Sequence, residues 1–185
     1  MNLRKCLSDS PLREKSIAGN LVTKEAYWAG WAVQVGELNS SPYVYKWSST
    51  GPIKGLFFKF PLRAGDTYTV SVKINNAPSY AARNLLINGY LTSLPAGNWT
   101  PEQYSTKNQQ YAKMGGVTRN GVETFTFTPT TNSEYVLIAI SFWNSTALDD
   151  FTVEEFSLVT GETALNPWEP SREAIYLQSG TNLQN

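Results

Sequence analysis

The stretch from Gly55 to Asn75 constrains the fold of this chain most strongly, because its apolar residues follow the spacing of β-strands. In its second half, Tyr, Val, Val and Ile stand at positions 68, 70, 72 and 74, and polar residues stand between them. That period of two is typical of strands with one buried face. Between the halves, Ala64, Gly65 and Asp66 predict a tight turn. A strand pair with one apolar face needs a second layer to cover it, so the stretch predicts a two-layer β domain.

The composition excludes several classes of function. Fifteen basic residues balance fifteen acidic residues, so no net charge favours nucleic acid or an anionic membrane as a partner. The chain has no histidine, which excludes a histidine-based catalytic triad and histidine-ligated metals. A single cysteine, Cys6, excludes an internal disulfide and a thiolate zinc cluster. No run of about 18 apolar residues is present, so no membrane insertion is expected.

Further strand patterns recur along the chain. Residues 135–143 are nearly all apolar, which predicts a central strand covered on both faces. Tyr27 and Trp28 are expected in a loop before the first strand. About eight or nine strands without a long helix predict an all-β fold, an antiparallel β-sandwich of jelly-roll type. The remaining predicted strands are 31–36, 43–47, 85–90, 123–128 and 151–159.

Residues 76–121 form the least regular part. Thr100 and Gln103 have the spacing of a helix capping box, with Pro101 at the first helical position. These residues predict a short helix from Pro101 to about Met114. An irregular insertion of this length is more often functional than idle.

The chain divides into three parts. Residues 1–19 are polar and read as an N-terminal arm or linker, residues 20–160 as the β-sandwich, and residues 161–185 as a Pro-rich exit with a polar C-terminal tail. The two prolines around Trp168 cannot continue a sheet interior. We therefore expect Trp168 to pack back on the sandwich.

Aromatic residues in polar loops suggest sugar binding. The chain has six Trp, ten Tyr and eight Phe, more than a sandwich core uses. An exposed ring stacks on the apolar CH face of a sugar, while nearby amides bond the hydroxyl groups. Eight aromatic residues are expected in the core: Trp31, Phe58, Phe60, Tyr68, Phe125, Phe127, Tyr135 and Phe156. The alternative to sugar binding is that half or more of the loop aromatic residues are core residues too. The candidate sugar-binding residues are Trp99 and Trp28 first, and then Tyr43, Tyr45, Trp47, Tyr104, Asn98 and Gln103.

The carboxylates favour a solvated surface over a catalytic pair. Glycoside hydrolysis needs two carboxyl groups that face each other across a cleft. Most of the candidates, Glu123, Asp149, Asp150, Glu154 and Glu155, lie on one strand or the loop beside it. We therefore expect no enzyme, and a hydrolase ranks third among the functions considered.

Three stretches resemble segments of known domains. The jelly rolls of carbohydrate-binding modules contain a hairpin similar to GLFFKFPLRAGDTYTVSVKI and a strand pair similar to ETFTFTPTTNSEYVLIAISFW. The closing strand and exit of such domains in tailed-phage tail and baseplate proteins resemble FTVEEFSLVTGETALNPWEPSREA. This resemblance implies a non-catalytic carbohydrate-binding module of a phage tail or baseplate that recognises host cell-surface glycan. The alternative is a structural tail component that contacts neighbouring subunits without sugar binding.

The resemblance also implies partners, a location and a metal. The partners would be host cell-surface polysaccharide, other tail or baseplate proteins, and further copies of the chain in a homo-oligomer. The chain would be made in the host cytoplasm, without a signal peptide, and would reside in the virion. Modules of this type often hold a structural Ca²⁺ near the first and last strands, and carboxylates suit that ion. Its candidate ligands are Asp149, Asp150, Glu154 and Glu155.

Overall fold

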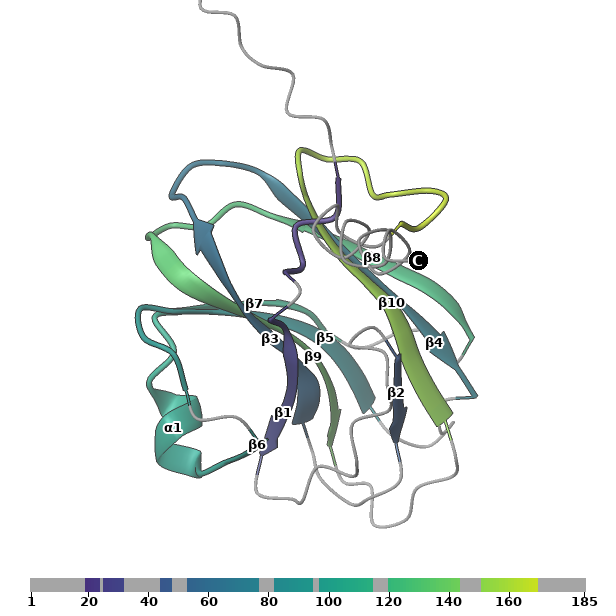
Figure 1. Ribbon diagram of the computed structural model, residues 1–185, viewed down its shortest axis with the longest axis horizontal. Coiled ribbons are helices and arrows are strands. Elements are labelled where there is room, and N and C mark those ends of the chain that lie inside the picture. Colours follow the sequence, from purple (N-terminus) through teal and green to yellow (C-terminus); the bar gives the residue numbers. More distant parts are fainter. Residues whose placement is uncertain are drawn as a thin grey trace, which may run out of the picture.

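The chain folds into two packed β-sheets. The computed structural model describes residues 19–23, 25–31, 44–47, 53–76, 82–94, 97–114, 120–143 and 151–169. A six-stranded sheet has the order β6-β1-β3-β9-β5-β7, and a four-stranded sheet has the order β2-β10-β4-β8. Figure 1 shows the two layers. The elements are β1 (Tyr27–Trp31), β2 (Val44–Trp47), β3 (Ile53–Leu62), β4 (Tyr68–Asn75), β5 (Ala82–Tyr90), β6 (Gly97–Trp99), α1 (Pro101–Ser105), β7 (Gln109–Lys113), β8 (Gly121–Phe127), β9 (Ser133–Trp143) and β10 (Phe151–Thr160).

The described strands confirm the all-β class and the antiparallel sandwich. Strands β3 and β5 both pair antiparallel with β9, which therefore lies inside the larger sheet. Val136 to Ser141 of β9 are all buried, as its apolar sequence predicts. Among the paired strands described, only β1 and β6 run parallel, and Trp31 and Trp99 are register partners there.

The main core lies between the two sheets. Apolar residues at alternate positions of β4 lie beside those of its neighbours β8 and β10 and face the six-stranded sheet, so the period of two in the sequence becomes one buried face. Phe58, Tyr68 and Phe127 are buried as predicted. Phe60 and Phe125 are half-buried and pack against this core.

A second apolar cluster covers the other face of the six-stranded sheet. The Phe57 ring stacks on the ring of Tyr135 at 5.7 Å, with 11° between the planes. Tyr27 and Tyr90 also lie against Phe57, with centroids at 5.3 and 5.7 Å. Tyr135, which the sequence predicts in the core, is half-buried and packs against this outer cluster, and β9 is covered on both faces.

Gly55 is required where β3 pairs with β9. A Cβ atom built on Gly55 would lie 2.1 Å from the Ile138 carbonyl oxygen and 2.5 Å from the Ala139 Cα. Backbone atoms cannot move aside as a flexible side chain does, so no larger residue fits this position.

Two sequence expectations about local structure are wrong. Tyr27 and Trp28 do not lie in a loop, because they begin β1. The helix that begins at Pro101 has the predicted capping box but ends at Ser105, and β7 follows at Gln109. Ser, Thr and Asn after the first turn compete for backbone hydrogen bonds and disfavour a longer helix. Thr106, for example, donates its hydroxyl to the Gln103 carbonyl at 2.7 Å.

No helix among the described residues has the length and apolar character that a membrane crossing requires.

Candidate functional site

The outer face of the four-stranded sheet carries polar side chains from β4 and β10. On β4, the residues between the core positions, among them Ser71, Lys73 and Asn75, point away from the core because side chains alternate along a strand. The hydroxyls of Ser71 and Ser157 lie 2.6 Å apart across the two strands. The four-stranded sheet therefore has one apolar face toward the core and one polar outer face.

A β-bulge in β10 brings two consecutive carboxylates to this face. The register between β10 and β4 shifts between Glu154 and Ser157. Glu155 has a φ of 55°, in the left-handed region that residues with a Cβ rarely adopt. The bulge places Glu154 and Glu155 on the same side of the sheet, although neighbouring residues of a regular strand point to opposite sides.

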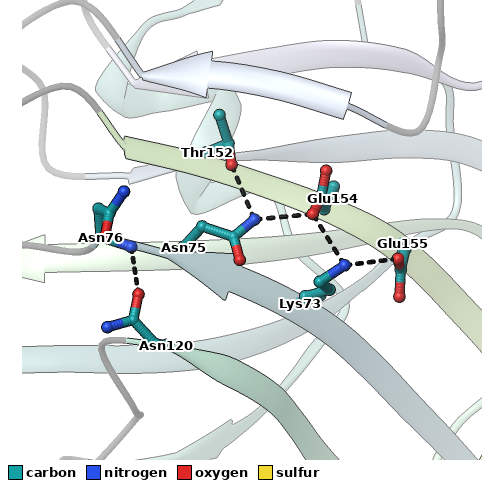
Figure 2. A network of polar contacts seen from close by, with 7 residues as sticks. All are labelled: Lys73, Asn75, Asn76, Asn120, Thr152, Glu154 and Glu155. Carbon is teal, nitrogen blue, oxygen red and sulfur yellow. Dashed lines mark hydrogen bonds and ion pairs between the residues drawn. The ribbon is translucent and has the colours of Figure 1, made fainter.

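Lys73 lies between these two carboxylates (Figure 2). Its Nζ is 3.1 Å from the Glu154 Oε1 and 2.8 Å from the Glu155 Oε1. Asn75 donates to the Glu154 Oε1 at 2.7 Å and to the Thr152 hydroxyl at 3.0 Å. The hydrogen bonds from Lys73, first to Glu155 and then to Glu154, raise the pKa of Lys73 above its ordinary value. Lys73 is therefore charged at neutral pH, and one ammonium faces two carboxylates.

A pocket of about 230 Å³ opens beside this ion network. One wall is formed by the outer faces of β4, β8 and β10, and the other by the exit segment that follows β10. The lining residues are Ser71, Lys73, Val122, Thr124, Glu155, Ala164, Leu165, Asn166 and Trp168. The pocket thus combines an indole with hydroxyl, amide and charged groups.

Trp168 fixes the exit segment to the bulge. It is half-buried, packs against the main core, and donates its indole N–H to the Phe156 carbonyl at 3.1 Å. The packing that the sequence predicts for Trp168 is therefore confirmed. The Phe156 carbonyl of the bulge thus anchors the exit segment, which forms one wall of the pocket.

Asn20 ties the N-terminal segment to the same bulge. Its buried amide donates to the Phe156 carbonyl at 2.9 Å and to the Glu169 carbonyl at 3.2 Å. Its Oδ1 accepts from the backbone N–H groups of Val22 at 3.1 Å and Leu158 at 3.2 Å. The Asn20 side chain thus links the N-terminal segment to both the last strand and the exit segment.

The predicted exposure of Trp28, one of the candidate sugar-binding residues, is wrong. Trp28 is only 3% exposed and belongs to the main core, where it meets Phe156 edge-on at 5.3 Å. Because Trp28 stands on β1 and its neighbours on the core face are apolar, burial is its most stable position, and it offers no exposed plate for a sugar.

The structure describes only the backbone of several other candidates. Asn98 and Trp99 lie on β6, Tyr104 lies on α1, and Tyr45 and Trp47 lie on β2, where Val153 and Phe151 are their register partners. Tyr43 lies outside the described residues. Gln103 serves the capping box, since its Oε1 accepts from the Thr100 backbone N–H at 2.9 Å. Gln103 is not among the described residues that line the pocket, and the sugar-binding role of all these candidates stays a prediction.

The calcium hypothesis also stays a prediction. Asp149 and Asp150 lie outside the described residues, and no group of three or more candidate ligands occurs among the residues that are described. The carboxylates of Glu154 and Glu155 instead hold the Lys73 ammonium. A metal ion bound by these two residues would compete with that ammonium.

Sequence reasoning missed most of the pocket. Alternation in β4 placed Ser71 and Lys73 on the polar face, but it gave no sign of the bulge that turns Glu155 toward them. Thr124 fell within the predicted strand 123–128 and Asn166 within the predicted Pro-rich exit, and nothing local marked either as a site residue. The signal that was available is the break in the alternation of this strand, where apolar residues at 151, 153, 156 and 158 leave two polar residues between 153 and 156, as one extra residue in a strand would.

No family model and no curated protein sequence matches this chain. Among solved structures, a family 16 carbohydrate-binding module has 16% identity and a TM-score of 0.42, over 65% of this chain and 78% of that chain. The CBM22-1–GH10 modules of Clostridium thermocellum endo-1,4-β-D-xylanase 10B, complexed with xylohexaose, have 15% identity and a TM-score of 0.39, over 80% and 28%. The enzymatically active domain of bacteriophage CBA120 tailspike protein 4 has 8% identity and a TM-score of 0.40, over 74% and 19%. At such identities nothing about ligand or activity follows.

Proposed function

We propose that this protein is a non-catalytic carbohydrate-binding domain and that the pocket beside Trp168 is its sugar site. The observation that carries the proposal is the lining, in which the Trp168 indole stands with the hydroxyl of Thr124, the amide of Asn166 and the carboxylate of Glu155. Sugars have both apolar CH faces and hydroxyl groups, so their recognition needs this mixture.

The size of the pocket favours a single sugar ring. Pockets for drug-sized ligands measure roughly 300–1,000 Å³, and this one measures about 230 Å³. A chain end or one exposed ring of a polysaccharide therefore suits it better than a long segment. One ring supplies little contact area, so we expect weak binding at each site, which many copies acting together would strengthen.

The carboxylates support binding rather than hydrolysis. Glu154 and Glu155 are consecutive residues on one strand and share the ammonium of Lys73, so they do not face each other across a bound sugar. A glycosidase places its two carboxyl groups on opposite sides of the scissile bond. Hydrolysis remains the third function, and release of reducing ends from a bound polysaccharide would support it.

We further propose that the domain belongs to a phage tail or baseplate and that its ligand is host cell-surface polysaccharide. The support is the resemblance of the last strand and the NPWEPS exit to the closing segments of tail and baseplate proteins. In that setting the domain would reside in the virion, contact other tail proteins and occur in several copies. Immunogold labelling of virions with an antibody to this chain tests the location directly.

A glycan array carrying bacterial cell-wall and capsular polysaccharides tests the binding function. We expect weak, reproducible signals from the folded domain and no cleavage of the bound glycans. Absence of any signal would favour the alternative, a structural tail component without sugar binding.

Trp99 defines a second possible surface for the same function, and the two sites can be separated by substitution. If the pocket is the site, Trp99→Ala binds like the parent while pocket variants do not. If Trp99 with Asn98, Tyr104 or the β2 aromatic residues forms the platform, the result is the reverse.

A further inference from the structure

We propose that the preferred ligand of the pocket carries a protonated amine beside its hydroxyl groups, which makes sugars with a free amine its ligand class. This inference rests on the proposed carbohydrate function and adds the chemical class of the sugar. It follows from the charge of the pocket, the atoms left to accept hydrogen bonds, and the position of the indole.

The charged side chains around the pocket are dominated by carboxylates. Lys73 and Glu155 line it, and the Oε1 of Glu154, which is not a lining residue, lies 3.1 Å from the Lys73 Nζ. One ammonium against two carboxylates leaves a net charge of −1, because both contacts converge on the same Nζ atom. An anionic sugar that approached Lys73 would also come close to the carboxylates of Glu154 and Glu155, which lie within 3.1 Å of the Lys73 Nζ. These negative charges would repel the sugar. Acidic sugars are therefore disfavoured.

The carboxylates retain capacity to accept a donor. The contacts that the described residues make with Glu154 and Glu155 all use the Oε1 atoms. An ionised carboxylate has about four lone-pair sites on its two oxygens. The Glu155 Oε2 is thus the natural acceptor for an ammonium in the pocket, and a hydrogen bond between two charged groups is stronger than one between neutral groups.

The remaining lining suits the rest of an amino sugar. The indole of Trp168 attracts a cation near its ring and also packs against the CH face of a sugar. Thr124 and Asn166 offer a hydroxyl and an amide to neighbouring sugar hydroxyls. An N-acetylated sugar has lost the positive charge and gained an acyl group, so it fits this small, acidic pocket less well.

The test measures calorimetric affinities for four tetrasaccharides, built from glucosamine, N-acetylglucosamine, glucose or glucuronic acid, at slightly acidic pH. We expect the glucosamine tetramer to bind about tenfold more tightly than the N-acetylated one, from the charged hydrogen bond and the cation–indole contact together. The glucuronic acid tetramer should bind most weakly. Added salt should reduce the preference for the amine.

Glu155→Gln keeps the size of the side chain and removes its charge, so it should bring the affinities for the amine and the N-acetyl ligand close together. Glu155→Asn is the second variant, because asparagine tolerates left-handed backbone. Glu134→Gln, an exposed carboxylate at the start of β9 and outside the pocket, is the matched control and should keep the preference. Equal wild-type affinities for the amine and N-acetyl ligands, or a preference that survives in both Glu155 variants, would overturn the amine inference and leave sugar binding intact. If none of the four ligands binds, the proposed function fails first.

Discussion

Glu155 is the residue where backbone strain and the proposed binding site coincide. An L-residue with a φ of 55° is less stable than glycine would be there, and yet a carboxylate stands at this position. Strain that the surrounding structure maintains is often found at functional sites. The lining of the pocket by Glu155 gives the strain a physical reason.

Glu155→Gly is predicted to leave the free energy of unfolding within about 1 kcal/mol of the parent. Relief of left-handed strain, about 1–2 kcal/mol, offsets the greater freedom of glycine in the unfolded chain, about 0.5–1 kcal/mol, and the loss of a partly exposed ion pair, about 0–1 kcal/mol. Denaturant melts measure this change. Glu154→Gly is the matched control, because it removes the same charge from a position without positive φ, and it should destabilise the fold more. An equal decrease in the free energy of unfolding of the two variants would mean that the backbone at Glu155 is not strained.

Tyr27 supplies a second prediction, in the outer aromatic cluster. Its hydroxyl donates to the Leu94 carbonyl at 2.5 Å, and burial, followed by the nearby Tyr135, raises its pKa from 10.0 to about 12. The unfolded chain releases this proton near pH 10, so the stabilisation is complete below pH 10 and is lost as the pH rises from 10 to about 12. Tyr27→Phe should therefore lose stability less steeply than the parent over that interval. Denaturant melts at a series of alkaline pH values test this, and parallel slopes for the two proteins would contradict it.

Among the strands and the segments that join them, the bulge in β10 organises the candidate site. Its Phe156 carbonyl accepts hydrogen bonds from Asn20 and Trp168, which come from opposite ends of the domain sequence. The pocket wall therefore depends on contacts that are distant in sequence.

Asn20→Ala is predicted to lower the free energy of unfolding by about 2–3 kcal/mol, because several buried groups lose their hydrogen-bond partner. Asn132→Ala is the control. Its Oδ1 accepts one exposed bond, from the Ala64 N–H at 2.9 Å, so a loss under about 1 kcal/mol is expected. Thermal or denaturant melts of both variants provide the comparison. A similar, small loss in the two would show that Asn20 does not hold the bulge.

The sequence predicted the elements with local signals better than those set by distant contacts. The alternation in residues 68–74 and the apolar run of β9 correctly gave strands and their buried faces. The capping box correctly gave the start of α1, and Ser, Thr and Asn after its first turn disfavour a longer helix, but no local pattern records the pairing of β7 with β5. Trp28 was misplaced for the same reason, since its burial follows from packing against Phe156 of β10.

For the domain as a whole, the two sheets differ in their outer faces. The six-stranded sheet has a buried apolar cluster on each face, with Phe57 and Tyr90 in the outer one. The four-stranded sheet keeps a polar outer face, where the exit segment closes a pocket over Ser71 and Lys73. A fold of this kind supports many functions, so the central claim concerns the pocket and not the sandwich.

Filling the pocket while leaving the core intact is the most direct test of that claim. Thr124 is exposed on the outer face of β8, so Thr124→Arg places a long side chain in the pocket without disturbing buried residues. Thr128→Arg is the matched control, because position 128 is also exposed, lies just after β8 and is about 13 Å along the chain from position 124 at strand spacing. Titration calorimetry with the best-binding glycan from the array should show affinity lost in Thr124→Arg, by about tenfold or more, and kept in Thr128→Arg, with both variants melting like the parent. Undiminished binding by a folded Thr124→Arg variant would contradict the assignment of this pocket as the sugar site.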